Sequence, residues 1–188
     1  MDKAKLRKKF KDIRINTSST QRHLADKNIS EKFLTLEEYK QCSALLVYVS
    51  SDIEVSTKEI MEVAFTEKKV YCPKCVKGTS IMYFYRIHNF SQLERGAFGI
   101  LEPVVDCEIC RNFDDDALCI VPALSYDKNG FRLGFGKGFY DRFLADFKGR
   151  KIGLCYESCL SEQLPKDKYD INVNKLVTEN SIYTFSDT

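Results

Sequence analysis

Three glycines at alternate positions, Gly134, Gly136 and Gly138, separate an apolar run from a helical pattern. The apolar run 117–121 predicts a buried strand, and residues 140–147 repeat apolar side chains at helical spacing. Glycines allow the backbone to approach an anion with its N–H groups turned inward, and the start of a helix adds positive dipole character. The order of strand, loop and helix therefore favours a phosphate-binding loop. A tight, close-packed turn is the alternative that the spacing leaves open.

Charged side chains beside the glycines fit a phosphate site. Arg132, at the entrance of the loop, offers a planar fork of donors to phosphate oxygens, and Lys137 within the loop is a mobile positive charge. Asp141 falls in the first predicted helical turn, where a carboxylate is a candidate ligand for Mg²⁺. No Ser or Thr follows Lys137 and the G-x-G-x-x-G spacing is absent, so the loop is neither of the two common nucleotide-binding motifs.

The chain of 188 residues suits one domain, and we expect residues 1–188 to form it. Its 29 basic and 27 acidic residues give a net charge of +2, which provides no strong field for nucleic acid or an anionic membrane. No apolar run approaches the roughly 20 residues that a membrane span needs. The charged N-terminal segment contains no apolar signal core, so we expect a cytoplasmic protein. We also expect a monomer.

Eight cysteines include two C-x-x-C pairs, Cys72 with Cys75 and Cys107 with Cys110. Such pairs can bind zinc, but the 31 residues between Cys75 and Cys107 exceed the usual separation of about 15–20. Buried thiols in a reducing compartment are the other interpretation, and it also suits the four remaining cysteines. Structural disulfides are not expected.

A second candidate site follows the apolar run 44–49, which is typical of a strand buried on both faces of a parallel sheet. Asp52 and Glu54 come directly after it, at the carboxyl end of the strand, where open α/β sheets bind ligands. Helix capping is the common alternative for such a pair. Because strand and helix patterns alternate along the chain, we predict an α/β fold. We expect one three-layer, Rossmann-like domain with a mostly parallel or mixed sheet and helices on both faces.

Residues 2–14 predict an amphipathic, strongly basic first helix. Lys3 and Arg7 are four residues apart and therefore share one face of it. A solvated surface is the ordinary role of such charges. Neither His23 nor His88 stands in a serine, cysteine or aspartate pattern typical of a catalytic triad.

The stretch Arg132–Asp141, RLGFGKGFYD, with Val121-Pro122 upstream, resembles the signature of the 5-formyltetrahydrofolate cyclo-ligase family. Asp52–Glu54 and Gly99–Pro103 resemble further elements of that family, and with the Lys/Arg pair of the first helix the resemblance covers nearly the whole chain. It implies ATP- and Mg²⁺-dependent conversion of 5-formyltetrahydrofolate to 5,10-methenyltetrahydrofolate, with release of ADP and phosphate. It further implies that the γ-phosphoryl group is transferred to the formyl oxygen before N10 closes the ring.

The resemblance also implies roles for residues of this chain. Lys137, Arg132 and Tyr140 would act in catalysis. Mg²⁺ would be held by Asp141 and Asn174. The nucleotide would be bound by Lys3, Arg7, Arg132, Leu133, Gly134, Phe135, Gly136, Lys137, Gly138, Phe139 and Tyr140, and the folate by Val49, Glu54, Phe139 and Tyr140.

Asn174 stands where the family has an aspartate. An asparagine carbonyl can bind Mg²⁺ or one of its waters, but it brings no negative charge. A non-catalytic nucleotide- or folate-binding module is therefore a second hypothesis. A zinc-binding interaction protein, resting on the two C-x-x-C pairs, is a third.

Overall fold

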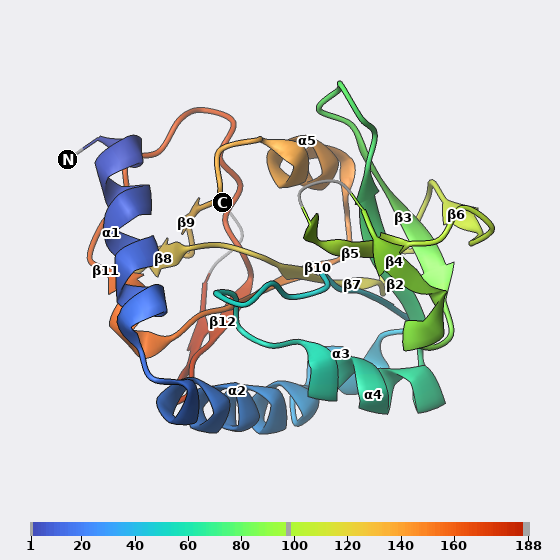
Figure 1. Cartoon of the computed structure of the whole chain (residues 1–188), viewed down its shortest axis with the longest axis horizontal. Coiled ribbons are helices and arrows are strands. Elements are labelled where there is room, and N and C mark those ends of the chain that lie inside the picture. Colours follow the sequence, from blue (N-terminus) through green and yellow to red (C-terminus); the bar gives the residue numbers. More distant parts are fainter. Residues whose placement is uncertain (1, 97–98, 186–188) are drawn as a thin grey trace.

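The computed structural model describes residues 2–96 and 99–185. Its centre is an eight-stranded sheet with the strand order β13-β12-β10-β7-β1-β2-β3-β6 (Figure 1). The strands of this sheet are β1 (Ala44–Leu46), β2 (Lys69–Cys75), β3 (Met82–Ile87), β6 (Ile109–Cys110), β7 (Leu118–Val121), β10 (Arg150–Leu154), β12 (Lys175–Val177) and β13 (Ile182–Thr184). Two smaller sheets contain β8 (Ser125–Asp127), β9 (Arg132–Leu133) and β11 (Leu160–Ser161), and β4 (Leu93–Arg95) and β5 (Leu101–Pro103). The helices are α1 (Lys3–Asn16), α2 (Ser19–Leu34), α3 (Glu37–Gln41), α4 (Lys58–Glu67) and α5 (Phe139–Asp146), with short 3-10 turns η1 (Phe90–Gln92) and η3 (Glu157–Cys159).

The central strands β12, β10, β7, β1 and β2 run parallel to one another, whereas β13 at one edge and β3 and β6 at the other are antiparallel to their neighbours. Helices α2, α3 and α4 cover one face of the sheet, and α5 lies on the opposite face (Figure 1). Helix α1 runs along the side of the molecule, next to β8 and β9. The mixed, mostly parallel sheet with helices on both faces confirms the predicted α/β fold class.

The strand order reverses between β1 and β7. The chain leaves β1 through α4 and returns to the sheet as β2 on one side, whereas it leaves β7 through α5 and returns as β10 on the other side. Loops that leave two neighbouring parallel strands in opposite directions open a crevice at the carboxyl ends of those strands. The loops after β1 and β7, which carry the two predicted ligand sites, therefore lie on either side of one such crevice.

Two strands differ in length from the apolar runs that predict them. The run 44–49 forms a strand only as far as Leu46, although the backbone N–H of Val47 still donates to the carbonyl oxygen of Tyr71 at 2.9 Å and Val47 and Tyr48 stay buried. β2, in contrast, continues past Pro73 to Cys75. Pro73 lies beyond the last residue of β2 that pairs with β1, so the strand is open on that side there, a position that proline tolerates.

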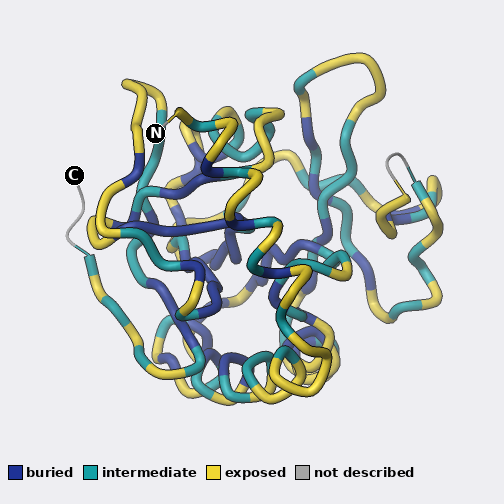
Figure 2. Tube along the Cα trace, turned by 60° about the vertical axis from the view of Figure 1, so that its left-hand side comes forward, coloured by how far each residue is buried: buried dark blue, intermediate teal, exposed yellow. Residues whose placement is uncertain are grey.

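Burial is concentrated in the central strands, whereas the outward sides of the helices are exposed (Figure 2). All four residues of β7 are buried between β1 and β10. Helix α5 is fixed to the sheet by aromatic contacts, in which the ring of Phe143 lies 4.7 Å from that of Phe84 on β3 and 5.3 Å from that of Phe147. In the part of the chain that the structure describes, no helix is long and apolar enough to cross a membrane.

Candidate active site

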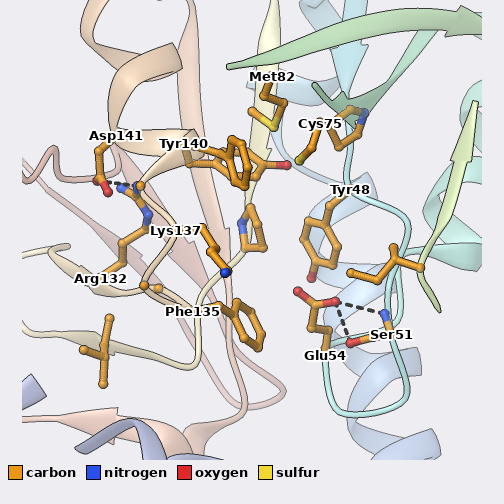
Figure 3. Close-up of a pocket in the computed structure, with 18 of the residues that line it drawn as sticks. Tyr48, Ser51, Glu54, Cys75, Met82, Arg132, Phe135, Lys137, Tyr140 and Asp141 are labelled. Carbon is orange, nitrogen blue, oxygen red and sulfur yellow. Dashed lines mark hydrogen bonds and ion pairs between the residues drawn. The ribbon is translucent and has the colours of Figure 1, made fainter. Parts of the chain in front are cut away.

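A cavity of about 670 Å³ lies at the carboxyl ends of β1 and β7 (Figure 3). Two loops form its opposite walls, residues 49–54 after β1 and residues 134–138 before α5. Figure 3 shows Arg132, Lys137 and Asp141 on one side of the cavity and Ser51 and Glu54 on the other. Every residue predicted to bind nucleotide, folate or Mg²⁺ lines this cavity, with the exception of Asn174.

A short hairpin leads into the glycine-rich loop. Strands β8 and β9 pair antiparallel, and the side chain of Asp127 closes the turn between them by accepting hydrogen bonds from the backbone N–H groups of Asn129 (2.9 Å) and Phe131 (3.1 Å). Gly130 occupies the turn with a positive φ of 78°. The turn-rich composition of this segment thus builds the rigid base from which the loop emerges.

Two glycines of the loop have backbone conformations that other residues rarely adopt. Gly136 has φ of 96° and Gly138, which precedes α5, has φ of 70°. A Cβ atom on Gly136 would also lie only 3.1 Å from the guanidinium carbon of Arg7. Arg7 in turn donates from Nε to the carbonyl oxygen of Gly134 at 2.9 Å. Glycine at 136 is therefore needed both for the turn and for the close approach of α1 to the loop.

Helix α1 presents three basic residues to the cavity, Lys3, Arg7 and Lys11, at successive intervals of four. Lys11 was not among the predicted residues, although its spacing continues that of the other two. Its ammonium group lies 5.9 Å from the centre of the Phe135 ring. Lys3 lies at the other end of the row, where its Nζ is 2.8 Å from carboxylate oxygens of both Asp167 and Asp170.

The acidic partners of Lys3, Asp167 and Asp170, were not among the predicted site residues. Burial alone would raise the pKa of Asp170, but the hydrogen bonds from Lys3 and from the backbone of Asp167 hold it below its ordinary value. The positive charge of Arg132 acts in the same direction. Asp170 is therefore an ionised carboxylate at the cavity wall.

Arg132 and Asp141 form a further ion pair on the same wall. The guanidinium of Arg132 is almost fully buried, with 4% of the side chain exposed, and it also donates to the carbonyl oxygen of Ile171 at 3.2 Å. Two cations of this wall, Lys3 and Arg132, are thus paired with carboxylates of the same wall. An incoming phosphate group and a divalent cation would each find a partner of opposite charge here.

The opposite wall is less charged. Oε2 of Glu54 accepts hydrogen bonds from the backbone N–H (2.9 Å) and the hydroxyl (2.8 Å) of Ser51. Burial raises the pKa of Glu54, and the Ser51 hydrogen bonds offset only part of that rise. Apolar side chains line the same cavity, those of Val49, Met82, Leu101 and Phe139 among them. A half-buried acid in a partly apolar cavity suits an uncharged, flat molecule with N–H donors.

Tyr140 stands where the two walls meet. Its hydroxyl is enclosed and has no hydrogen-bond partner among the described residues, although its ring is half-buried. Burial raises the pKa of this hydroxyl well above its ordinary value, so the group stays protonated. An enclosed donor without a partner is a polar group available to a ligand.

Asn174 lies away from this cavity, at the start of β12. Its side-chain oxygen accepts the backbone N–H of Lys151 at 2.8 Å, and it lines a separate depression with Arg150 and Asn172. The structure therefore brings Asp141 together with Asp167 and Asp170 on the wall of one cavity, but not with Asn174.

The four cysteines of the C-x-x-C pairs lie in different surroundings. Cys72 is fully buried in β2 and Cys107 is nearly so, whereas Cys75 lines the cavity and Cys110 is half-buried. Within residues 2–96 and 99–185, no group of three or more His, Cys, Asp or Glu side chains is arranged to hold a metal ion. The C-x-x-C pairs thus form no four-thiolate zinc site among the described residues.

Fold and site together define an α/β enzyme with a two-part cavity, in which a basic glycine loop faces a half-buried acid across the reversal point of a parallel sheet. The model of the 5-formyltetrahydrofolate cyclo-ligase family matches residues 1–179. The chain belongs to this family.

Relatives with the same description cover most of the chain. A 5-formyltetrahydrofolate cyclo-ligase from Haemophilus influenzae is 30% identical over 88% of this chain and 91% of its own. The solved structure of an Aquifex aeolicus 5,10-methenyltetrahydrofolate synthetase is similar over 100% of this chain and 95% of its own, with a TM-score of 0.85 and 36% identity. A synthetase from Mycoplasma pneumoniae, 22% identical with a TM-score of 0.74 over 95% of this chain and 99% of its own, has the same fold.

Proposed function

We propose that this chain converts 5-formyltetrahydrofolate to 5,10-methenyltetrahydrofolate with consumption of ATP, in a Mg²⁺-dependent reaction that releases ADP and phosphate. The observation that carries the proposal is the cavity with two unlike walls. A basic wall with backbone N–H groups suits the phosphates of a nucleotide, and a partly apolar wall with one half-buried acid suits a pterin ring. Both substrates are needed in one site for a group to pass between them.

The proposed reaction has two chemical steps. The formyl oxygen of the folate attacks the γ-phosphorus of ATP, which breaks the bond to the β-phosphate oxygen and releases ADP. N10 then attacks the activated formyl carbon, its proton passes to solvent, and the former formyl oxygen leaves as part of inorganic phosphate. The formyl group needs this activation because an amide oxygen is otherwise a poor leaving group.

Such chemistry asks the protein for positioning and charge stabilisation rather than for a nucleophile. We propose that Lys137 and Arg132 stabilise the negative charge that spreads over the transferred phosphoryl group. Lys3, Arg7 and the N–H groups of residues 134–138 would bind the remaining phosphate oxygens. Gly136 would contribute here because it has no side chain and can adopt the left-handed backbone of the loop, so that the backbone can approach a phosphate group closely.

The folate would lie against the Glu54 wall. We propose that Glu54 accepts hydrogen bonds from the N–H donors of the pterin ring, and that Val49 and Phe139 pack against the faces of the ring. Tyr140 would stand at the junction of the two substrates, where its unpartnered hydroxyl can donate a hydrogen bond and its ring keeps water away from the transferred group.

The carboxylates of the basic wall suit Mg²⁺. This ion prefers oxygen ligands and is commonly held by one or two carboxylates together with substrate phosphates. Asp141 and Asp170 both line the cavity, and both lie under the influence of Arg132. We propose these two as the protein ligands, with Asn174 outside the site. Bound there, Mg²⁺ would neutralise charge on the phosphate oxygens.

The test is the absorbance of the methenyl product after the protein is mixed with 5-formyltetrahydrofolate, ATP and Mg²⁺, beside samples that lack either ATP or Mg²⁺. We expect a rise in the complete mixture only. A flat trace from protein that binds both substrates by calorimetry would overturn the proposal and favour a non-catalytic binding module. We further propose that residues 1–188 act as one domain and as a monomer in the cytoplasm. Sedimentation analysis with and without substrates tests the monomer.

A further inference from the structure

The loop that carries Glu54 is held at four consecutive carbonyl groups. Each of these oxygens accepts a hydrogen bond from a side chain outside the loop. The four pairs are Asp52 with Arg22, Ile53 with Arg14 (2.9 Å), Glu54 with Tyr156 (3.3 Å), and Val55 with Tyr48 (2.9 Å). Loop carbonyl groups can bond to water instead, so side-chain donors on four consecutive carbonyl groups restrain this part of the loop. The position of Glu54 is therefore set by its surroundings before any ligand binds.

Arg14 differs from the other three donors because it also reaches the opposite wall. It lies in the last turn of α1 with 1% of its surface exposed. One terminal nitrogen, Nη1, donates to Ile53, while the other, Nη2, donates to the carbonyl oxygens of Ala123 (2.8 Å) and Leu124 (2.9 Å). A single buried guanidinium thus connects the loop after β1 with the segment after β7.

The second contact leads directly to the glycine loop. The backbone N–H of Leu124 donates to the carbonyl oxygen of Leu133 at 2.8 Å, and Leu133 is the residue before Gly134. The same helix that carries Arg14 also carries Arg7, which binds the carbonyl oxygen of Gly134. The side chain of Arg14 therefore connects the loop that carries Glu54 with the segment that positions the phosphate-binding loop.

The use of arginine for this connection is informative. A buried cation is costly unless its donors are satisfied. Here the terminal nitrogens of Arg14 donate to neutral carbonyl groups, the buried Nε has no hydrogen-bond partner among the described residues, and the ring of Tyr156 lies 5.5 Å from the guanidinium carbon. Lysine cannot reproduce the arrangement, because its single ammonium group lacks the rigid, planar fork that spans carbonyls of two segments. The fork fixes a separation as well as supplying hydrogen bonds.

We propose that Arg14 is a positioning residue that sets the separation between the folate-binding and phosphate-binding walls, so that the two substrates meet in reacting geometry. The proposal rests on the proposed function, in which a phosphoryl group passes directly between two bound molecules. A misplacement of about 1 Å in such a reaction can lower the rate by about 100-fold while each substrate still binds.

The experiment compares the wild-type protein with Arg14→Lys and Arg14→Met, and with Ile29→Ala as a matched control. Ile29 is fully buried in α2 and does not line the cavity, so its truncation lowers stability without touching either wall. For each protein we would measure the melting temperature, the affinities for ATP and for 5-formyltetrahydrofolate separately, and kcat well below the melting temperature. Hydrogen exchange of the peptides covering residues 50–57 and 123–136 would be followed in parallel.

For Arg14→Lys we expect kcat to fall by about 100-fold, with each separate affinity within about threefold of the wild type. Exchange should accelerate in both peptides together. Ile29→Ala should lose melting temperature while keeping its kcat and the protection of both peptides. Arg14→Met extends the comparison to a long side chain without hydrogen-bond donors. If Arg14→Met does not fold, Arg14→Lys alone carries the test.

An Arg14→Lys protein with wild-type kcat, or with faster exchange in neither peptide, would refute the positioning role. Loss of activity matched by equal loss in Ile29→Ala would reduce Arg14 to a contributor to stability. If the wild-type protein itself shows no turnover, the proposed function fails first. The exchange measurement then still decides whether Arg14 joins the two walls.

Discussion

The loop that carries Glu54 and the loop that carries Lys137 face each other across one cavity, but they are held by different kinds of contact. The first is fixed by hydrogen bonds from buried side chains to its backbone, among them those of Arg14 and Tyr48. The second lies beside two sets of ion pairs on the cavity wall, those of Lys3 with Asp167 and Asp170 and that of Arg132 with Asp141. The backbone of the Glu54 wall is thus held in place before a ligand binds, whereas on the basic wall Lys3 and Arg132 are neutralised by nearby carboxylates.

This difference indicates how the two substrates would be received. A flat, neutral ring gains most from a wall that does not have to move. Phosphates with a divalent cation can exchange partners with an existing ion pair, because the cations then turn to phosphate and the carboxylates to the metal ion. The predictions below separate the two walls, from the largest expected effect to the smallest.

Lys137→Ala should have the largest effect on the charged wall. We expect kcat to fall by about 10²- to 10³-fold, since a positive group aimed at the transferred phosphoryl is lost. Lys137 is exposed, so the melting temperature should change little. Steady-state kinetics and thermal denaturation check both statements. Lys148→Ala, on an exposed residue after α5 that does not line the cavity, is the matched control and should keep full activity.

Glu54→Gln should raise KM for the folate by about 10- to 100-fold, because hydrogen bonds to a charged group are lost, while KM for ATP stays near the wild-type value. An equal rise in both constants would contradict the separation of the walls.

The pH dependence of the same variant tests the electrostatics. Burial raises the pKa of Glu54, so lowering the pH from neutrality should protonate it early and weaken folate binding in the wild type but not in Glu54→Gln. Because a raised pKa means that the ionised form opposes folding, Glu54→Gln should melt at a higher temperature at pH 7. This gain should vanish below pH of about 4, where Glu54 is protonated in both states.

Gly136→Ala should disturb the glycine loop more than the addition of one methyl group would suggest. The left-handed backbone at this position strains any other residue by about 1 kcal/mol or more, and the new methyl group would press on Arg7. Gly78→Ala provides a control with similar φ and open space around it, outside the cavity. Both should lose stability in denaturant titrations, and Gly136→Ala should lose at least as much as Gly78→Ala. Weaker ATP binding is expected for Gly136→Ala alone, and equal ATP affinity in the two variants would count against the loop as a phosphate site.

Asp170→Asn should have the smallest effect on stability. The pKa of Asp170 is lowered in the folded protein, so its contribution is present above the unfolded value of about 3.9 and is lost as the pH falls through the folded value. We expect a deficit below about 1 kcal/mol at pH 7, because the ion pair with Lys3 is partly exposed, and no deficit at low pH. The same variant should need more Mg²⁺ for ATP binding, measured by calorimetry. An unchanged Mg²⁺ requirement would remove Asp170 from the metal site.

Features encoded locally were predictable from the sequence. The glycine spacing, the four-residue interval between Lys3 and Arg7, and the acid after the first buried strand each depend on a few neighbouring residues. The structure brings all of them to one cavity, because the carboxyl ends of parallel strands meet at one edge of the sheet.

Contacts between distant parts of the chain were not predictable in this way. Lys3 and Asp170 are 167 positions apart, and nothing in the residues around either of them predicts that they form an ion pair. The prediction for Asn174 rested on its place in a family pattern, whereas its position in space is set by the pairing of β12 with β10. Arg14 looks like one more charge of a basic helix, and only the packing of two loops around it makes it a buried residue.

The most direct test of the central claim, that the two walls bring formyl oxygen and γ-phosphate together, follows the oxygen atom. The protein would be supplied with 5-formyltetrahydrofolate labelled with ¹⁸O in the formyl group, ATP and Mg²⁺, and the released phosphate would be examined by ³¹P NMR. We predict one ¹⁸O atom in each phosphate, because the formyl oxygen leaves bonded to phosphorus. Unlabelled phosphate, formed in step with the methenyl product, would contradict the account.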